Sequence, residues 1–237
     1  MESAIEKSVS LTILSDYSIA EDLSKIYPED LRWHKLYELN SQEGLRNRLI
    51  VLKNIAKAIN GLHKTGLYCL VDLKPENILI TCGGKISIID IDSIQIKTSN
   101  HFFKSTAFTP NYLPAEAYEK REKDIPLNTD SDVFAFACCA YMILTGTHPY
   151  TNVILKNPYN YEEYNLISSR IKAGLYLRGS KSAYISHVNP QFDLHKNYDR
   201  LPECIQLLFN KSFNNIRRPS MTDWIKGLNE GKKQIQL

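Results

Sequence analysis

A chain of 237 residues with 43% hydrophobic and 23% charged residues has ordinary globular composition, which argues against disorder and leaves room for one good-sized domain. Its formal net charge of +3 is too mild to predict binding to nucleic acid or to an anionic membrane surface. Five cysteines without disulfide spacing, no signal-peptide pattern and no long apolar stretch together predict a soluble protein of the reducing cytoplasm.

The N-terminal part of the chain predicts short elements followed by one long helix. Residues 8–15 alternate loosely between apolar and polar side chains, which predicts a strand, and residues 19–27 predict a short helix. Between residues 45 and 62, leucine, isoleucine and alanine recur at spacings of three and four, which predicts an amphipathic helix. Ser41 is its expected N-cap, and Gly66 lies just beyond its end.

Two β-branched segments in the middle of the chain predict a hairpin. Residues 77–81 and 85–89 are joined through Cys82-Gly83-Gly84, and glycines supply the positive φ angles that a tight turn needs. Residues 93–128 are polar and contain three prolines, so we expect a long functional loop there.

The rest of the chain predicts helices. Residues 132–144, DVFAFACCAYMIL, are apolar on nearly every side, which is typical of a buried helix. Amphipathic helices are expected at about residues 160–173, 201–212 and 221–230. The sequence therefore predicts a mainly helical, α+β domain with a small β-hairpin near its middle.

Side chains suited to phosphate chemistry gather around the predicted hairpin. Asp72, Lys74 and Asn77 fall within six residues of one another, and Asp90 follows the second strand. Because a hairpin brings its two ends together, Asn77 and Asp90 should lie side by side. Carboxylate and amide oxygens suit Mg²⁺, an ammonium suits a phosphoryl group, and a second carboxylate can accept a proton from an attacking hydroxyl. These are the parts that phosphoryl transfer requires.

The segment LVDLKPENILI, residues 70–80, resembles the catalytic loop of protein kinases, His-Arg-Asp-Leu-Lys-x-x-Asn. Asp90 lies where that family has the aspartate of its Asp-Phe-Gly motif. The segment TPNYLPAE, residues 109–116, is similar to the end of the family's activation segment. IDIDSIQ, residues 89–95, also resembles divergent bacterial kinase-like proteins.

The resemblance continues toward the C-terminus. DVF at 132–134 and LTG at 144–146 match the ends of a buried helix of the family, and RPS at 218–220 matches its late Arg-Pro pair. These motifs follow one another in the order and at the spacing of the family from about residue 45 to residue 230. This stretch therefore resembles the C-terminal lobe of a serine/threonine-type protein kinase.

The resemblance implies a role for each matching residue. Asp72 would orient and deprotonate the substrate hydroxyl, Lys74 would hold the transferring phosphate, and Thr109 would support the hydroxyl beside them. ATP and Mg²⁺ are the implied cofactors, and a protein is the implied substrate. The residues implied to bind the nucleotide are Lys74, Asn77, Leu79 and Asp90, of which Asn77 and Asp90 would also bind the metal.

Two further matches imply structural roles. Asp132 would brace the backbone of the catalytic loop, and Glu116 would pair with Arg218.

The sequence departs from the family where the His-Arg pair before the catalytic aspartate is replaced by Leu70-Val71. The missing arginine normally holds a phosphate on the activation loop, so we expect no activation by phosphorylation of that loop. Leu70 is expected to pack against Ile91, which replaces the phenylalanine of the metal motif. Asp92 replaces the glycine and is interpreted as a solvated turn residue or, alternatively, as a further metal ligand.

The segment before the long helix is too short for a complete small lobe. It has no Gly-x-Gly-x-x-Gly loop and no Val-Ala-Ile-Lys-like strand, so the usual Lys–Glu pair over ATP is not expected. We expect residues 1–44 to be a remnant of the interlobe strand, hinge and first helix, and residues 45–237 to form the C-terminal lobe. A small lobe or a partner protein would then cover the nucleotide cleft.

Three functions stay open at this point. The first is a Mg-ATP-dependent serine/threonine protein kinase, which the intact Asp72, Lys74, Asn77 and Asp90 favour. The second is a truncated lobe or pseudokinase that binds a partner protein as a scaffold, which the missing lid favours. The third is a small-molecule phosphotransferase of the same fold, which the Lys-Pro-Glu-Asn sequence disfavours.

Overall fold

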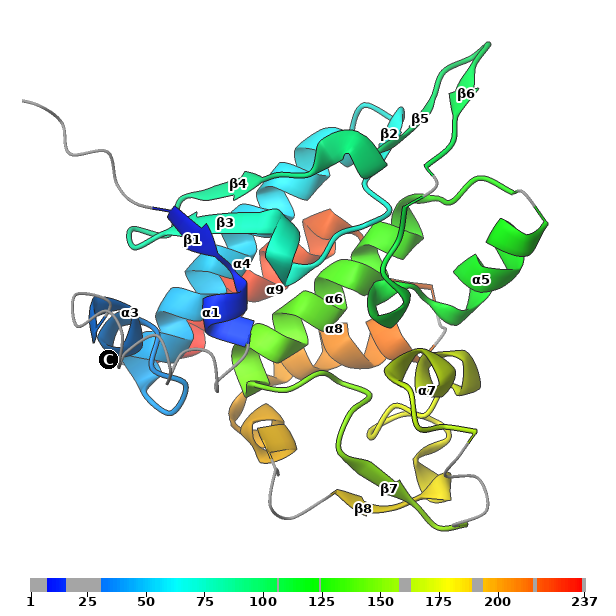
Figure 1. Ribbon diagram of the computed structural model, residues 1–237. Helices are drawn as coiled ribbons and strands as arrows, with labels where there is room; N and C mark the ends of the chain where they lie inside the picture. The colour runs from blue at the N-terminus through cyan, green and yellow to red at the C-terminus, as the bar shows by residue number, and fades with distance from the viewer. Residues whose placement is uncertain are drawn as a thin grey trace, which may run out of the picture.

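The computed structural model describes residues 8–15, 31–105, 107–123, 125–157, 163–188, 194–214 and 217–235. Figure 1 shows helices α4, α6, α8 and α9 forming most of the body, with short strands at its edges. The predicted class, a mainly helical α+β domain, is confirmed. None of the helices in these ranges is long and apolar enough to cross a membrane.

Helix α4, Gln42–His63, is the predicted amphipathic helix. Ser41 is its N-cap, as expected, and its Oγ accepts the backbone N–H of Gly44 at 2.9 Å. The apolar stripe is buried against α9, Met221–Gln234, which is the last predicted amphipathic helix. Helix α3, Leu31–Leu36, packs beside α4.

Helix α6, Thr129–Thr145, is buried along almost its whole length, as its all-round apolar sequence predicts. It contacts α4 and α8, Glu203–Phe213. Gly146 ends the helix with a φ of 85°, a left-handed conformation that glycine adopts without strain. The core continues into aromatic packing between α6, α8 and α9, in which the rings of Phe136 and Trp224 meet edge to face at 5.1 Å.

The predicted hairpin is formed by β3, Ile78–Thr81, and β4, Ile86–Ile88. The strands are antiparallel, with Ile78 opposite Ile88. Gly84 in the turn has a φ of 78°, which explains the glycine at that position. Strand β1, Ser8–Ser10, adds to the other side of β3, so the sheet order is β1-β3-β4.

The strand predicted for residues 8–15 is wrong beyond Ser10. Helix α1, Thr12–Ser15, follows β1 directly, because the Oγ of Ser10 accepts the N–H of Thr12 at 3.3 Å and turns the chain. The helix predicted for residues 19–27 lies outside the described residues.

The segment 93–128, expected to be one long loop, contains regular elements. Strand β5, Gln95–Lys97, pairs with β2, Tyr68–Cys69, and with β6, Phe102–Phe103, and α5 follows at Ala115–Glu122. These strands are two or three residues long, which is too short for a period-2 pattern to show.

The lower part of the domain holds the remaining elements. Helix α7, Ile167–Ala173, is shorter than the predicted 160–173, and residues 158–162 lie outside the described ranges. Strands β7, Val153–Leu155, and β8, Ile185–Val188, form a two-stranded antiparallel sheet. The described residues also include 3-10 helices at Pro75–Asn77, Ile91–Ser93, Pro110–Tyr112, Ser182–Tyr184 and Leu194–Arg200.

The buried guanidinium of Arg48 ties the N-terminal elements to the body. Its Nη1 donates to the carbonyl of Leu14 at 2.8 Å and to that of Ile143, and its Nε donates to the carbonyl of Tyr37 at 2.8 Å. These carbonyls lie at or just beyond the C-terminal ends of α1, α6 and α3, where helices leave acceptors without partners and favour a cation.

Candidate active site

The catalytic-loop segment leaves β2 through a strained residue. Val71 has a φ of 64°, a left-handed value that a β-branched side chain adopts only under constraint. Asp132, on the first turn of α6 and 1% exposed, accepts the backbone N–H of Leu70 at 2.8 Å and that of Val71 at 3.0 Å. The prediction that Asp132 braces this loop is confirmed, and the bracing holds the backbone in its strained turn.

Asp132 has two further contacts that fix its carboxylate. His63, the last residue of α4, approaches Oδ2 with its Nε2 at 2.9 Å, and the thiol of Cys69 lies 3.4 Å from Oδ1. Burial, with Asp132 next in importance, raises the pKa of the Cys69 thiol, so this group stays protonated and donates. The bracing carboxylate therefore joins α4, α6 and β2 at one point.

The three side chains with predicted catalytic roles are brought together. The Nζ of Lys74 lies 3.0 Å from Oδ2 of Asp72 and donates to Oγ1 of Thr109 at 3.0 Å. Asp72 is 7% exposed, and in the described part of the chain no donor reaches its Oδ1. A buried carboxylate oxygen without a partner is costly, which suggests that a group from outside this chain supplies the donor.

Asn77 and Asp90 are held side by side by the hairpin, as predicted. The N–H of Ile89 donates to the carbonyl of Asn77 at 2.9 Å, so Asp90 follows directly beyond the paired residues. The Nδ2 of Asn77 donates to the carbonyl of Asp72 at 2.9 Å, which leaves its Oδ1 as the amide atom suited to a cation. Asp90 is exposed and has a φ of 57°, a conformation that aspartate tolerates better than most residues.

The donor set at this edge suits a hard cation that takes most of its ligands from elsewhere. Among the described residues, no group of three or more His, Cys, Asp or Glu side chains could hold a metal by itself. One carboxylate and one amide oxygen fit Mg²⁺, which usually keeps several waters and binds substrate phosphates. Leu79 is half-buried and alternates with the buried Ile78 and Ile80, so it faces away from the core.

Leu70 and Ile91 line the same small cavity, but the isoleucine packs only in part. Ile91 is 59% exposed, whereas Leu70 is buried, so most of the isoleucine surface faces solvent. The cause is the left-handed turn at Asp90, after which Ile91 starts a 3-10 helix whose C-terminal residue, Ser93, points inward and donates to the carbonyl of Asp90 at 3.2 Å. Asp92 is exposed in the same helix, as expected of a solvated turn residue.

The segment after Thr109 is held by residues that the sequence did not reveal. The Nε2 of His148 donates to the carbonyl of Asn111 at 3.1 Å, and its Nδ1 accepts the N–H of Tyr150 at 3.3 Å. Burial lowers the pKa of His148 to about 3, so the ring is neutral and keeps this single tautomer. A lone histidine before Pro149 carries no sequence signal for this contact.

Two other contacts fix the segment that joins Asp90 to α6, one at its ends and one at α5. Gln95, 4% exposed, donates from Nε2 to the carbonyl of Leu127 at 2.7 Å and accepts the N–H of Leu127 at 3.0 Å with Oε1. The predicted pair of Glu116 and Arg218 is confirmed, with Nη2 3.3 Å from Oε2 and a second, closer contact between Nη1 and Oε1. The segment is thus fastened without any phosphate.

Comparisons with known proteins agree with this geometry. A family model described as a protein kinase domain matches residues 1–226. A SNF1-related protein kinase catalytic subunit of Arabidopsis thaliana is 24% identical over 168 residues, which is 69% of this chain and 31% of that protein. The serine/threonine-protein kinase Nek3 of Mus musculus is 27% identical over 58% of this chain and 24% of its own length. An Aurora kinase of Saccharomyces cerevisiae is 29% identical over 58% of this chain and 38% of its own length. The matched region thus spans less than two fifths of each of these relatives.

Proposed function

Because this chain belongs to the protein kinase family, we propose that it transfers the γ-phosphate of ATP to a serine or threonine hydroxyl of a protein substrate with the help of Mg²⁺. Use of ATP and a divalent metal is general in the family, whereas Mg²⁺ in particular, Asp72 as the base and the protein substrate are parts of the proposal. The named kinases among its relatives support the serine/threonine assignment.

The observation that carries the proposal is the unpartnered Oδ1 of Asp72. Lys74 and Asn77 approach the other oxygen, Oδ2, at 3.0 and 3.4 Å, which fixes the plane of the carboxylate. Oδ1 is therefore oriented and has no donor among the described residues. A substrate hydroxyl that donates to this oxygen satisfies it, is oriented for attack, and can pass on its proton as the new bond forms.

Lys74 and Thr109 complete the acceptor side of the site. The ammonium of Lys74 lies between Asp72 and Thr109, within 3.0 Å of an oxygen of each. In that position it can hold a phosphoryl oxygen beside the attacking hydroxyl and offset the charge that develops on transfer. Thr109 keeps the ammonium in place and borders the position of the substrate hydroxyl.

Asn77 and Asp90 are proposed to bind the metal and Leu79 to contact the nucleotide. When bound, Mg²⁺ would supply charge neutralisation of the phosphates. The cavity enclosed by Leu70, Asp72, Asn77 and Asp90 measures only about 10 Å³, room for about one water, so the nucleotide would lie above it on the exposed face of the sheet.

The scaffold alternative is favoured by one observation. Ile89 and Ile91, on either side of Asp90, are 39% and 59% exposed, and such apolar residues at the open cleft suit a protein partner. A partner that only docks there needs Ile91 but not the carboxylates, and this difference separates the two functions.

Mg²⁺-dependent ATP binding by calorimetry and phosphate transfer to serine- and threonine-containing peptides test the proposal together. Asp72→Asn is expected to keep ATP binding and to lower transfer by about 10²- to 10⁴-fold, the usual range for a lost general base. Asp90→Asn is expected to lose Mg²⁺-dependent binding. Asp92→Asn, two residues from Asp90 and exposed, is the matched control and should change neither. Full transfer by Asp72→Asn would refute the role of the base, and absence of ATP binding by the unmodified chain would leave the scaffold function.

A further inference from the structure

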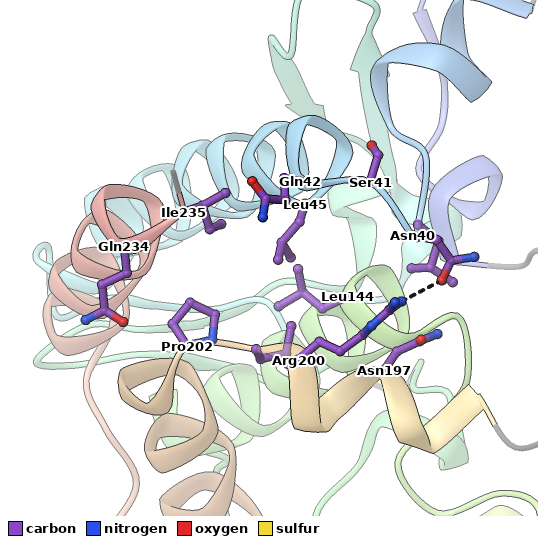
Figure 2. Close-up of a pocket in the computed structure, with 12 residues that line it drawn as sticks. Asn40, Ser41, Gln42, Leu45, Leu144, Asn197, Arg200, Pro202, Gln234 and Ile235 are labelled. Atoms are coloured by element: carbon purple, nitrogen blue, oxygen red, sulfur yellow. Dashed lines mark hydrogen bonds between the residues drawn. The ribbon is translucent and has the colours of Figure 1, made fainter. Parts of the chain in front are cut away.

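A second pocket lies at the end of α6 remote from Asp132. It has a volume of about 570 Å³, within the range of small-molecule sites, and Figure 2 shows its lining. Its walls come from the start of α4, the end of α6, the 3-10 helix Leu194–Arg200, the start of α8 and the end of α9. None of the residues assigned to phosphate transfer lines it.

The floor of this pocket is apolar and belongs to the main core. Leu144 is 2% exposed and Leu201 is 5% exposed, so both are fixed by packing behind the surface. Leu45 and Ile235 are half-buried, and Figure 2 shows the side chain of Leu45 beside that of Leu144, with Ile235 farther along the same wall. Because Leu144 and Leu201 expose almost no surface, a ligand body would remove apolar surface from water mainly at Leu45 and Ile235, which favours binding by about 25 cal/mol per Å².

The rim has one formal charge and several neutral amides. Among the twelve described residues that line the pocket, Arg200 alone is charged. Its Nη1 donates to Oδ1 of Asn40 at 3.0 Å, which orients the guanidinium across the opening in Figure 2 without neutralising it, since the partner is an amide. Gln42 and Gln234 add further amide groups at the opening.

The polar part of the pocket is held in place before any ligand arrives. Asn197, 5% exposed, donates from Nδ2 to the carbonyl of Thr145 at 3.0 Å. Ser41 and Pro202, the N-cap residues of α4 and α8, line the pocket together with the C-terminal ends of α6 and α9, so these opposing helix ends leave the preference for an anion to Arg200.

We propose that this pocket binds a small molecule with an apolar body and a single carboxylate, the body on Leu45 and Ile235 above the buried Leu144 and Leu201, and the carboxylate on Arg200. A planar guanidinium suits a carboxylate because it can donate two parallel hydrogen bonds. A phosphate group, with about twice the charge, would meet one cation and an apolar floor, which fits the pocket less well. The proposal rests on this pocket alone and is independent of phosphate transfer.

Methyl-labelled NMR spectra of the full chain, titrated with 4-phenylbutanoate and with its neutral amide, 4-phenylbutanamide, test the proposal. The two probes have the same apolar body and differ in charge. We expect 4-phenylbutanoate to shift the methyl signals of Leu45, Leu144, Leu201 and Ile235, and to bind about tenfold more tightly than the amide, a difference of about 1.4 kcal/mol.

Two variants connect that difference to the guanidinium. Arg200→Gln should bind both probes equally and weakly, and because Arg200 is exposed its replacement leaves the core intact. Lys196→Gln removes one positive charge from the same 3-10 helix outside the pocket and should keep the tenfold preference. Equal binding of both probes by the unmodified chain, shifts confined to other parts of the molecule, or no shifts up to the solubility of the acid would each overturn the proposal.

Discussion

Replacing Asp132 by asparagine would test whether its carboxylate holds the catalytic loop in a strained form. The change keeps the size of the side chain and removes its charge. The carboxylate accepts two backbone N–H groups, from Leu70 and Val71, at 2.8 and 3.0 Å. An asparagine can accept only one of them well and presents an NH₂ group to the other.

The expected loss follows from two opposing terms. Hydrogen bonds to a charged group contribute about 1.5–3 kcal/mol each, so the two bonds together contribute about 3–6 kcal/mol, of which the amide oxygen keeps part. Relaxation of Val71 from its φ of 64° would return about 1–3 kcal/mol. We therefore expect Asp132→Asn to lower the free energy of unfolding by about 2–3 kcal/mol, which corresponds to roughly 5–10 °C in Tm for a chain of this size.

Chemical denaturation is the appropriate assay, read as a lower midpoint at an unchanged m-value. Asp130→Asn, on the same turn of α6 but exposed and bonded only to the side chain of Asn128 in the described structure, is the matched control. It should change stability by less than about 0.5 kcal/mol, as is usual for surface sites. If the two variants were equally stable, the bracing role of Asp132 and the strain argument would both be wrong.

Three more predictions concern the segment between Asp90 and α6 and the residues that hold it. Burial lowers the pKa of His148 from 6.5 to about 3, so between these pH values the unfolded chain binds a proton that the folded chain does not, and stability falls as pH drops below about 6.5. Between about pH 7.5 and 5.5 the unmodified chain should therefore lose about 1 kcal/mol more of its free energy of unfolding than His148→Gln, measured by denaturation at both pH values. Gln95→Ala leaves the buried N–H and carbonyl of Leu127 without their partner and should lower the free energy of unfolding by about 2 kcal/mol. Phosphatase treatment of the unmodified chain should leave its activity unchanged, and an activity that depends on phosphorylation would contradict this expectation.

Local sequence patterns were sufficient for the elements that depend on local interactions. Helix α4 followed from the spacing of its apolar residues and from Ser41, and the β3–β4 hairpin from its glycine pair. The grouping of Asp72, Lys74 and Asn77 followed from their spacing once the hairpin was assumed. Thr109 could be added only through the family resemblance, because 35 residues separate it from Lys74.

The features that the sequence did not predict depend on distant parts of the chain. Helix α1 replaces the end of a predicted strand, and the N–H of Leu11 just before it bonds to the carbonyl of Ile78, a contact no local pattern contains. The left-handed φ at Val71 is disfavoured for a β-branched residue, and it is held by the carboxylate of Asp132, which lies far along the chain on α6. The contact of His148 with Asn111 is likewise a result of tertiary packing.

The position of Arg48 also has a consequence for the order in which the chain folds. Its guanidinium joins carbonyls of residues 14 and 37 to that of Ile143, a contact that spans 95 positions along the chain. During synthesis the N-terminal elements are made first, yet the helix end that completes this contact emerges much later. Closing so long a loop is slow, because its conformational entropy is lost before the contact can stabilise the chain. We therefore expect the contact of Arg48 with Ile143 to form later than its contacts with Leu14 and Tyr37.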